Sequence, residues 1–449
     1  MFTVEALPAP ELGNASFLIV DAERGTGVVI DPTRDIDRYL TRAEQLGIRL
    51  THSVDTHLHN DFVSGRRELE AAVGTNIDEV EPGAELPLGG LSLRALLTPG
   101  HTPDHKSYLL LEQGRPRALF SGGAVMVGGI ARTDLFGPHL ATHLALEAYR
   151  TLQVRLRGLP DDLAVFPTHG SGSFCGTAAV SGHETTLGRE RSTNPFFLAT
   201  ELMPFLARIL DQHRFPDYYR DMAAINRDGA PLLGRNAPAP PPMTADQVAG
   251  SMEQGAAVID IRSARDYDRA HIPGTYSIPV GGDSFSAWAG WLVARDRPIV
   301  LVGGTSIEQR EAQLQLHRIA FDRIAGALDG GLEAWVASAR PTSHFETATI
   351  EDMAGWVLRG EVMTVVDARD DHEWAEGHAP GAVHMYLPDV PHHAAEIPVD
   401  APVAVHCASG YRAGMAASLL ELAGLKRVIH VSGDFSQWNR LHLAEVHPA

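Results

Sequence analysis

The sequence predicts an α/β protein of several domains, and three observations lead to that prediction. With 449 residues, the chain has the length of about three average domains. A proline-rich segment at 236–243 interrupts it, because such a segment is extended and cannot continue a helix or a central strand. After that segment the chain repeats itself, and in each repeat short apolar strands alternate with helices. This alternation is typical of a parallel sheet that is covered on both faces.

The repeat divides the second half of the chain into two related domains. Residues 258–262 match 365–369, and residues 271–274 match 378–381 with the same separation, so no gap lies between the two matches. We therefore predict a first domain at 1–235, a linker at 236–243, a second domain at 244–340 and a third domain at 345–449.

Composition and charge exclude several classes of protein. The chain has 37 Lys and Arg against 56 Asp and Glu, a net charge of −19, so nucleic acid and anionic membrane surfaces would repel it. No apolar run approaches the roughly 18 residues of a membrane span. We expect neither nucleic acid nor a membrane as a partner, while the sequence is compatible with a homo-oligomer.

The cysteine count and the first residues bear on the cellular compartment. Cys175 and Cys407 are the two cysteines, which excludes a disulfide scaffold and any four-cysteine metal site. The first residues lack the basic start and apolar stretch of a secretory signal. We therefore expect a cytoplasmic protein.

Cys407 lies in a loop between a predicted strand and a predicted helix at 413–424. Loop N–H groups and the helix dipole favour a negative charge at such a place, so we expect this thiol to be largely ionised. Arg412 adds a fixed positive charge, while Ser409 and Gly410 permit the tight curve of the backbone. A buried structural cysteine is the alternative. The loop position together with the Gly and Arg residues favours a reactive one.

The third domain resembles a rhodanese, which is a sulfurtransferase. Four residues separate Cys407 from Arg412, one fewer than in a phosphatase loop, and this length suits a terminal sulfur atom. The remaining matches lie at 367–369, 373–374, 378–382 and Trp438. The resemblance implies that Cys407 takes sulfane sulfur from thiosulfate or a persulfide and passes it to a thiol acceptor. Arg412 and the loop backbone would stabilise the sulfur anion, and residues 367 and 369 would be structural.

The second domain resembles a rhodanese without its nucleophile. The residue that matches Cys407 is Gly303, and no cysteine lies between 176 and 406. Sulfur relay through a thiol is therefore excluded there, and we interpret the domain as a catalytically inactive spacer or docking domain.

Histidines of the first domain have the spacing of metal ligands. His57, His59 and Asp61 alternate after a predicted strand, so their side chains can converge on one ion. His101 and His169 add imidazoles from two later turns. In this order the motifs resemble the metallo-β-lactamase superfamily, which implies an αββα sandwich at 1–235 ahead of two rhodanese-like doubly wound α/β domains.

Further residues are similar to the persulfide dioxygenase branch of that superfamily. Phe62 stands where the hydrolases have a histidine of the second metal site. The branch holds one ferrous iron on two histidines and one carboxylate, and the resemblance gives His57 and His101 as the histidines. The carboxylate position, however, is Gly123, which has no donor atom.

Three outcomes for the metal stay open at this point. The site is iron-bound through a substitute ligand, or it holds zinc on His57, His59 and His101, or it is degraded and empty. If it is degraded, Gly123→Asp should raise iron occupancy. Cys175 is either near this site or an inert buried thiol.

The leading hypothesis is a sulfur-handling enzyme in which Cys407 transfers sulfane sulfur beside a persulfide dioxygenase-like domain. One alternative is a metal-dependent thioester hydrolase of the glyoxalase II type, which Phe62 and Gly123 oppose because a two-metal site would lack two ligands. Another is a non-enzymatic binding protein with vestigial sites, which the intact Cys407 loop opposes.

Overall fold

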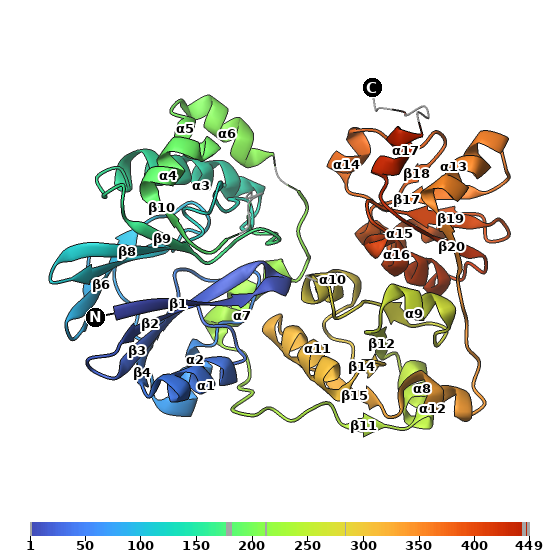
Figure 1. The fold of residues 1–449 in the computed structure, drawn as a ribbon, viewed down its shortest axis with the longest axis horizontal. Coiled ribbons are helices and arrows are strands. Elements are labelled where there is room, and N and C mark those ends of the chain that lie inside the picture. Colours follow the sequence, from blue (N-terminus) through green and yellow to red (C-terminus); the bar gives the residue numbers. More distant parts are fainter. Residues whose placement is uncertain (1, 177–181, 212, 283, 442–445, 447–449) are drawn as a thin grey trace. The chain divides into compact units, whose positions relative to one another are not determined.

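The computed structural model describes residues 2–176, 182–211, 213–282, 284–441 and 446, and its chain forms two compact units (Figure 1). The first unit comprises Met1–Ala237 and Leu314–Asp322, and the second comprises Pro238–Gln313 and Arg323–Ala449. The α/β multidomain class predicted from the sequence is confirmed. Residues 442–445 and 447–449 of the third predicted domain lie outside the described residues.

The first unit contains two sheets. One sheet consists, in spatial order, of β1 (Phe2–Ala9), β2 (Asn14–Asp21), β3 (Thr26–Ile30) and β4 (Arg49–Val54). The other consists of β10 (Thr185–Thr186), β9 (Ala164–Pro167), β8 (Arg115–Gly122), β7 (Lys106–Glu112), β6 (Leu91–Leu97) and β5 (Glu85–Leu88). The pairs β3–β4 and β8–β9 are parallel, and the other described pairs in this unit are antiparallel.

Helices cover the outer face of each sheet. Those of the first unit are α1 (Asp37–Leu46), α2 (Arg66–Val73), α3 (Pro138–Arg150), α4 (Leu187–Thr193), α5 (Pro195–Leu198), α6 (Leu202–Leu210) and α7 (Tyr219–Asp228). Helices α1 and α2 lie against the four-stranded sheet and α3 to α6 against the six-stranded one (Figure 1). The αββα sandwich expected from the resemblance is therefore confirmed.

The uninterrupted apolar residues of strand β2 are explained by burial on both of its faces. Phe17 and Ile19 pack between the two sheets, where the ring of Phe17 lies 5.6 Å from that of Phe120. Leu18 and Val20 point to the opposite face and pack with residues of α1. A strand that is buried on both faces needs apolar side chains at every position, so it shows no polar alternation.

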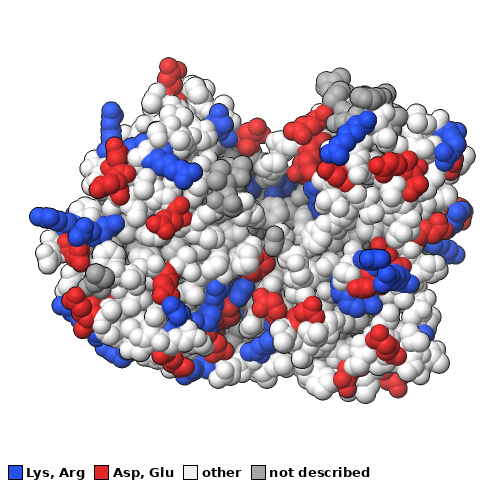
Figure 2. Space-filling view, viewed as in Figure 1, with Lys and Arg blue, Asp and Glu red and all other residues white. Residues whose placement is uncertain are grey.

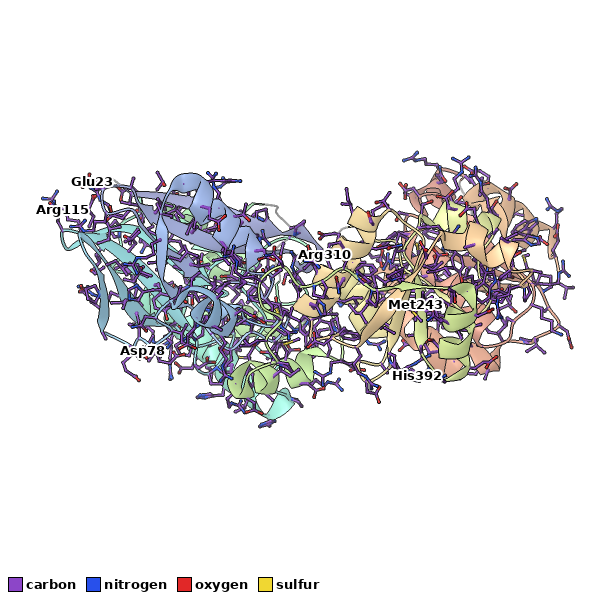
Figure 3. The ribbon with its side chains drawn as sticks, turned by 90° about the horizontal axis from the view of Figure 1, so that it is seen from below. Glu23, Asp78, Arg115, Met243, Arg310 and His392 are labelled. Atoms are coloured by element: carbon purple, nitrogen blue, oxygen red, sulfur yellow. The ribbon has the colours of Figure 1, made fainter. Side chains whose placement is uncertain are left out.

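The sandwich brings several loops together at one end of its strands. Glu23 and Arg115, both labelled in Figure 3, lie at the other end, Glu23 in the turn before β3 and Arg115 as the first residue of β8. The histidine motifs follow the carboxyl ends of β4 and β9, and His101 lies in the loop from β6 to β7. The fold therefore gathers the predicted ligands, although they are far apart in the sequence.

The second unit contains two five-stranded sheets in which the described strand pairs are all parallel. The strands of the first are, in spatial order, β11 (Pro242–Met243), β15 (Ile324–Leu328), β14 (Ile299–Val302), β12 (Ala257–Asp260) and β13 (Tyr276–Ser277). Those of the second are β16 (Glu346–Thr349), β20 (Val428–Ser432), β19 (Val403–His406), β17 (Thr364–Asp367) and β18 (Val383–His384). Position by position the two orders correspond, so the repeat in the sequence is a repeat of one topology.

Helices alternate with these strands along the chain. In the first repeat they are α8 (Ala245–Glu253), α9 (Ala264–Arg269), α10 (Phe285–Leu292), α11 (Ser306–Arg318) and α12 (Gly331–Ala337). In the second they are α13 (Ile350–Arg359), α14 (Asp371–Ala375), α15 (Val390–His393), α16 (Tyr411–Leu422) and α17 (Ser436–Arg440). Met243, labelled in Figure 3, ends β11 directly after the proline-rich segment.

The visible surface carries both signs of charge. Figure 2 shows Asp and Glu side chains interspersed with Lys and Arg over the face in view. Among the helices of the described residues, none combines the length and the apolar character that crossing a membrane requires.

Candidate functional site

Five histidines form one buried cluster at the carboxyl ends of the strands in the first unit. The ring of His57 lies 4.2 Å from that of His59, 4.8 Å from that of His101, 4.9 Å from that of His105 and 5.3 Å from that of His169, between ring centroids. All five side chains are buried. The cluster thus contains His57, His59 and His101, the ligands predicted from the sequence.

In the neutral forms of His57 and His169, hydrogen bonds at Nδ1 place the proton on that nitrogen and the lone pair on Nε2. Thr56 donates its hydroxyl proton to Asp31, so its oxygen accepts from Nδ1 of His57 at 2.8 Å. Nδ1 of His169 donates to the amide oxygen of Asn14 at 2.9 Å. The two Nε2 atoms, each with a lone pair, face one another at 3.3 Å.

That separation is the one expected for two ligands of a single ion. Nitrogens that bind one zinc ion at about 2.0–2.1 Å lie about 3.3 Å apart at the tetrahedral angle. Two lone pairs at this distance repel one another unless a cation or a proton lies between them. The histidine cluster therefore fits a metal ion.

His59 presents its other ring nitrogen to the cluster. Its Nε2 faces Asp31 at 3.1 Å, and its buried Nδ1 has no hydrogen-bond partner among the described residues. A carboxylate behind an imidazole is the arrangement that orients histidine ligands of metals. Asp31 itself is fixed by the backbone N–H of Thr56 and the hydroxyl of Thr168.

His101 is oriented in the same way by a backbone group. Its Nδ1 donates to the carbonyl of Arg132 at 2.7 Å. Its Nε2 is buried and has no hydrogen-bond partner within the described parts of the chain. The free lone pair of His101 is therefore aimed into the protein rather than at solvent.

Among the described residues, two triads that include His169 have ligand atoms close enough to hold a metal ion. His57, His59 and His169 form one, and His101, His169 and Cys175 form the other, with ligand atoms within 4.8 Å of one another in each. His169 belongs to both. The three predicted ligands thus divide between two triads, and His169 and Cys175 join them.

The charge states of the cluster follow from burial and from the carboxylates nearby. Burial, assisted by the neighbouring imidazoles, holds the pKa of His57 and of His101 well below the usual value. Burial also opposes the charged form of His59, but the Asp31 carboxylate outweighs it and raises the pKa of His59 to about 9. For Asp61, the imidazole of His169 outweighs burial and lowers the pKa. Burial, together with Asp61, raises the pKa of the Cys175 thiol well above its usual value.

Gly123 occupies a place where a side chain does not fit. A Cβ atom there would lie 2.6 Å from Cβ of Ala131 and 2.9 Å from Cδ2 of His101. The backbone N–H of Gly123 donates to Nε2 of His105 at 3.0 Å, which holds the segment in place. These close contacts oppose the expectation that Gly123→Asp would repair an iron site, because the added side chain would have to displace Ala131 or His101.

The second candidate site lies in the second unit, at the loop after β19. Cys407 is buried, and its sulfur accepts hydrogen bonds from the backbone N–H groups of Gly410 at 3.1 Å and Ala413 at 3.3 Å. Gly410 has a φ of +91°, which glycine adopts without strain. Helix α16 begins at Tyr411, two residues earlier than predicted, so Arg412 lies in its first turn. Ser409 is exposed.

Arg412 is held by a carboxylate that the sequence argument had treated only as part of a motif. Its guanidinium donates to both oxygens of Glu373 at 2.6 and 2.7 Å. Burial opposes the charged form of Glu373, but Arg412 outweighs it and lowers the pKa of Glu373. The pair fixes the guanidinium beside the loop and neutralises part of its charge. As predicted for structural residues, Arg369 donates to Asp367 and to the carbonyl of Gly377.

In the corresponding loop of the first repeat, a different side chain fills the space that the cysteine sulfur occupies in the second. Gly303 has a φ of +78°, and a Cβ there would lie 2.3 Å from Cγ of Arg262. The arginine side chain therefore occupies the space that a nucleophile would need. This is consistent with the inactive domain that the sequence predicts.

The histidine cluster also contains functional residues that the sequence argument did not select. His169 was identified as an imidazole but not as a ligand, and Asp31 was not identified. The signal for Asp31 was its position directly after the apolar run 27–30. His57 likewise follows the end of the next strand, so both residues lie where their strands end.

Comparisons with known proteins match both parts of the chain. The rhodanese-like domain family matches residues 244–338 and 350–441. Hydroxyacylglutathione hydrolase of Synechococcus sp. is 34% identical over 184 residues, which are 37% of this chain and 67% of that protein. Mitochondrial persulfide dioxygenase of Homo sapiens is 28% identical over 193 residues, 40% of this chain and 70% of that protein.

A solved structure covers more of the chain. The crystal structure of a metallo-β-lactamase from Staphylococcus aureus subsp. aureus COL is similar with a TM-score of 0.66 and 29% identity. The match covers 73% of this chain and 98% of that one.

The closed space at Gly123 generates a first prediction. Gly123→Asp should lower the free energy of unfolding by about 1–3 kcal/mol, the range for overpacking, without raising the metal content of the purified protein. Ala131→Gly in the same chain removes the nearest contact and should recover part of the loss, with Ala131→Gly alone as the control. Denaturant titration and elemental analysis measure both quantities. A Gly123→Asp protein of wild-type stability with more iron would contradict this account.

The Arg412–Glu373 pair generates a prediction with a pH dependence. Glu373→Gln should cost about 1–2 kcal/mol of stability at neutral pH, since a charged hydrogen-bonded pair is lost from a half-buried position. The pKa of Glu373 is lower in the folded state, so its contribution is complete above the unfolded value of about 4.3 and is lost as the pH falls through the folded value. The difference between wild type and variant should therefore shrink on acidification. Glu361→Gln, which removes the exposed partner of Arg359, is the control and should change little. A difference that stays constant down to strongly acidic pH would refute the assignment.

Proposed function

This chain belongs to the metallo-β-lactamase-fold proteins related to persulfide dioxygenases and glyoxalase II, fused to two rhodanese-like domains, and we propose that it transfers sulfane sulfur through the thiol of Cys407. The active domain in this proposal is the one at 345–449. The domain at 244–340 takes no part in covalent chemistry, because it contains no cysteine.

The observation that carries the proposal is the pair of N–H groups on the sulfur of Cys407. Donors at 3.1 and 3.3 Å from a buried sulfur favour a negative charge on it, and the start of α16 adds its dipole. Arg412 contributes a permanent positive charge nearby. Such surroundings favour a thiolate, which is the nucleophilic form of cysteine.

The proposed reaction has two balanced steps. In the first, the thiolate of Cys407 attacks the outer sulfur of thiosulfate, the sulfur–sulfur bond of the donor breaks, and sulfite leaves with the bonding electron pair. Cys407 then carries a persulfide. In the second, an acceptor thiolate attacks the outer sulfur of that persulfide, and the thiolate of Cys407 leaves. A small persulfide can replace thiosulfate as the donor, with its thiolate as the leaving group.

A second candidate function belongs to the first unit, and the unpartnered buried donors of the histidine cluster favour it. His57, His59, His101 and His169 would hold the metal, which when bound would act on a thiol-derived substrate as a Lewis acid or as an oxygen-binding iron. Phe62 is fully buried and its ring stacks on His59 with 4.2 Å between centroids, so an apolar ring fills the place of a second-metal ligand. This supports one metal rather than two.

Oxygen uptake with glutathione persulfide, compared with thioester hydrolysis of a hydroxyacylglutathione, separates the dioxygenase from the hydrolase.

The proposed sulfur transfer predicts that one thiol is essential. Cys407→Ser should abolish turnover of thiosulfate with cyanide as the acceptor, because serine cannot accept sulfane sulfur. Cys175→Ser is the matched control and should leave the rate unchanged, since that thiol lies in the other unit. Steady-state assays of both variants provide the measurement. A Cys407→Ser protein that transfers sulfur at the wild-type rate would rule the proposal out.

A further inference from the structure

The backbone of Cys175 is held beside the histidine cluster by Arg132, the residue whose carbonyl orients His101. The carbonyl of Arg132 accepts the Nδ1 proton of His101 at 2.7 Å, and the N–H of Arg132 donates to the carbonyl of Cys175 at 2.8 Å. The Cys175 N–H in turn donates to the hydroxyl of Ser173. Arg132 therefore fixes the imidazole of His101 relative to the backbone of Cys175.

The three side chains of this triad are buried, and their ligand atoms lie close together. His101, His169 and Cys175 are 2%, 0% and 0% exposed, and their ligand atoms lie within 4.8 Å of one another. Nε2 of His101 is a buried nitrogen without a hydrogen-bond partner in the described chain. In the neutral form of His169 the lone pair lies on Nε2, because Nδ1 donates to Asn14. An unpaired buried nitrogen is costly, and a bound cation removes that cost.

Cys175 also lies beside the segment in which a carboxylate ligand is absent. The carbonyl of Gly123 accepts from the N–H of Ala131, and Ala131 pairs with Gly176 across an isolated antiparallel bridge. Gly123, Ala131 and Gly176 are therefore adjacent backbone segments, and Cys175 precedes the last of them. A thiol, which becomes a negatively charged ligand when a metal ion displaces its proton, is thus available next to the position that Gly123 leaves without a donor.

We propose that Cys175, His101 and His169 form a metal site in which the thiolate replaces the carboxylate. Two imidazoles and one thiolate suit a thiophilic divalent cation such as zinc, which binds sulfur and nitrogen donors in a tetrahedral site. His57 lies next to this triad, with its Nε2 3.3 Å from that of His169. The site therefore prefers zinc or a similar thiophilic cation, and Cys175 is one of its ligands.

Cobalt(II), which takes the place of zinc and absorbs light, is the probe. It is added to metal-free full-length Cys407→Ser protein, in which Cys175 is the one remaining cysteine. We expect one equivalent of cobalt to produce a thiolate-to-cobalt charge-transfer band in the near ultraviolet, and zinc to displace it. His101→Gln should weaken the band, and His183→Gln, which changes a half-buried histidine outside both triads, should retain it.

A second comparison uses zinc affinity. Adding Cys175→Ser to the same protein should remove the band and lower zinc affinity by more than the roughly 10- to 100-fold that losing an outer-shell partner costs. Cobalt that binds Cys407→Ser protein without the band would be held by nitrogen and oxygen alone, which overturns the proposal. A failure of this protein to bind cobalt at all overturns it as well. Both of these contradicting results would be obtained with the Cys407→Ser protein, which retains Cys175.

A different observation concerns the inactive rhodanese-like domain and the active one, which belong to the same compact unit. Asp268 of α9 accepts a hydrogen bond from Nδ1 of His430 at 2.8 Å. Nε2 of His430 donates to the carbonyl of Gly410 at 3.0 Å, and the N–H of Gly410 donates to the sulfur of Cys407. A carboxylate of one domain is thereby connected to the nucleophile loop of the other.

The geometry points to Asp268 as a positioning residue for the Cys407 loop, an inference that rests on the proposed sulfur transfer. Asp268, His430 and Gly410 are all buried, so water does not compete for these hydrogen bonds. Helix α16 also packs closely on α9, since a Cβ at Gly414 would lie 3.1 Å from Cβ of Ala264. The domain without a cysteine therefore orients the N–H group that contacts the reactive sulfur.

Asp268→Ala tests this role against a control from the same interface. It should lower kcat for thiosulfate with cyanide by about tenfold, the scale of one lost charged hydrogen bond, and leave KM unchanged. Asp268→Asn keeps an oxygen acceptor and should rescue most of the rate. Glu421→Ala is the control, because Glu421 binds His271 and Ser343 across the interface without reaching the loop. It should lower the melting temperature but not kcat.

The outcomes separate this role from simple loss of stability. A kcat that falls in both Asp268→Ala and Glu421→Ala in proportion to their melting temperatures would overturn the positioning role, as would a wild-type kcat in Asp268→Ala. A wild-type protein without sulfur transfer would instead contradict the proposed function itself.

Discussion

Two peptide N–H groups donate to one sulfur atom, and the chemistry of the second unit depends on that contact. The groups belong to Gly410 and Ala413, at the point where a parallel strand ends and a helix begins. The same strand, loop and helix occur in the first repeat, where the space of a nucleophile is filled by the Arg262 side chain at Gly303. One topology thus holds a cysteine sulfur in the loop of one copy and an arginine side chain in the loop of the other. The difference lies in a few side chains rather than in the sheet.

The first unit uses the same ends of its strands for a different kind of group. There the loops present imidazole lone pairs rather than N–H donors, and hydrogen bonds behind the rings fix which nitrogen faces inward. Asp31 does this for His59 and the carbonyl of Arg132 does it for His101. Buried nitrogens without hydrogen-bond partners destabilise the protein unless a metal ion binds them. Cys175 changes which ion that is, because a thiolate favours zinc over a site built from oxygen.

Much of this could be predicted from the sequence, for identifiable reasons. The repeat and the proline-rich segment predicted the α/β class and the domain boundaries, because strand patterns and proline geometry are local properties. Cys407 was predicted because its neighbours in the chain are also its neighbours in space. Glu373 and Asp268 were not, since each reaches the loop from a distant segment and its role exists only after the sheet has formed. Gly123 shows the converse: the sequence revealed the absent carboxylate, but only the structure shows Ala131 and His101 closing over the position.

The central claim is that sulfur passes through Cys407, and the most direct test is to locate the sulfur on the protein. Wild-type protein is incubated with thiosulfate, freed of excess donor, digested and mapped by mass spectrometry, before and after addition of an acceptor thiol. The account predicts a gain of one sulfur atom on the peptide that contains Cys407, and its loss when the acceptor is added. Sulfur found on the Cys175 peptide instead, or no gain on either peptide while turnover proceeds, would contradict it.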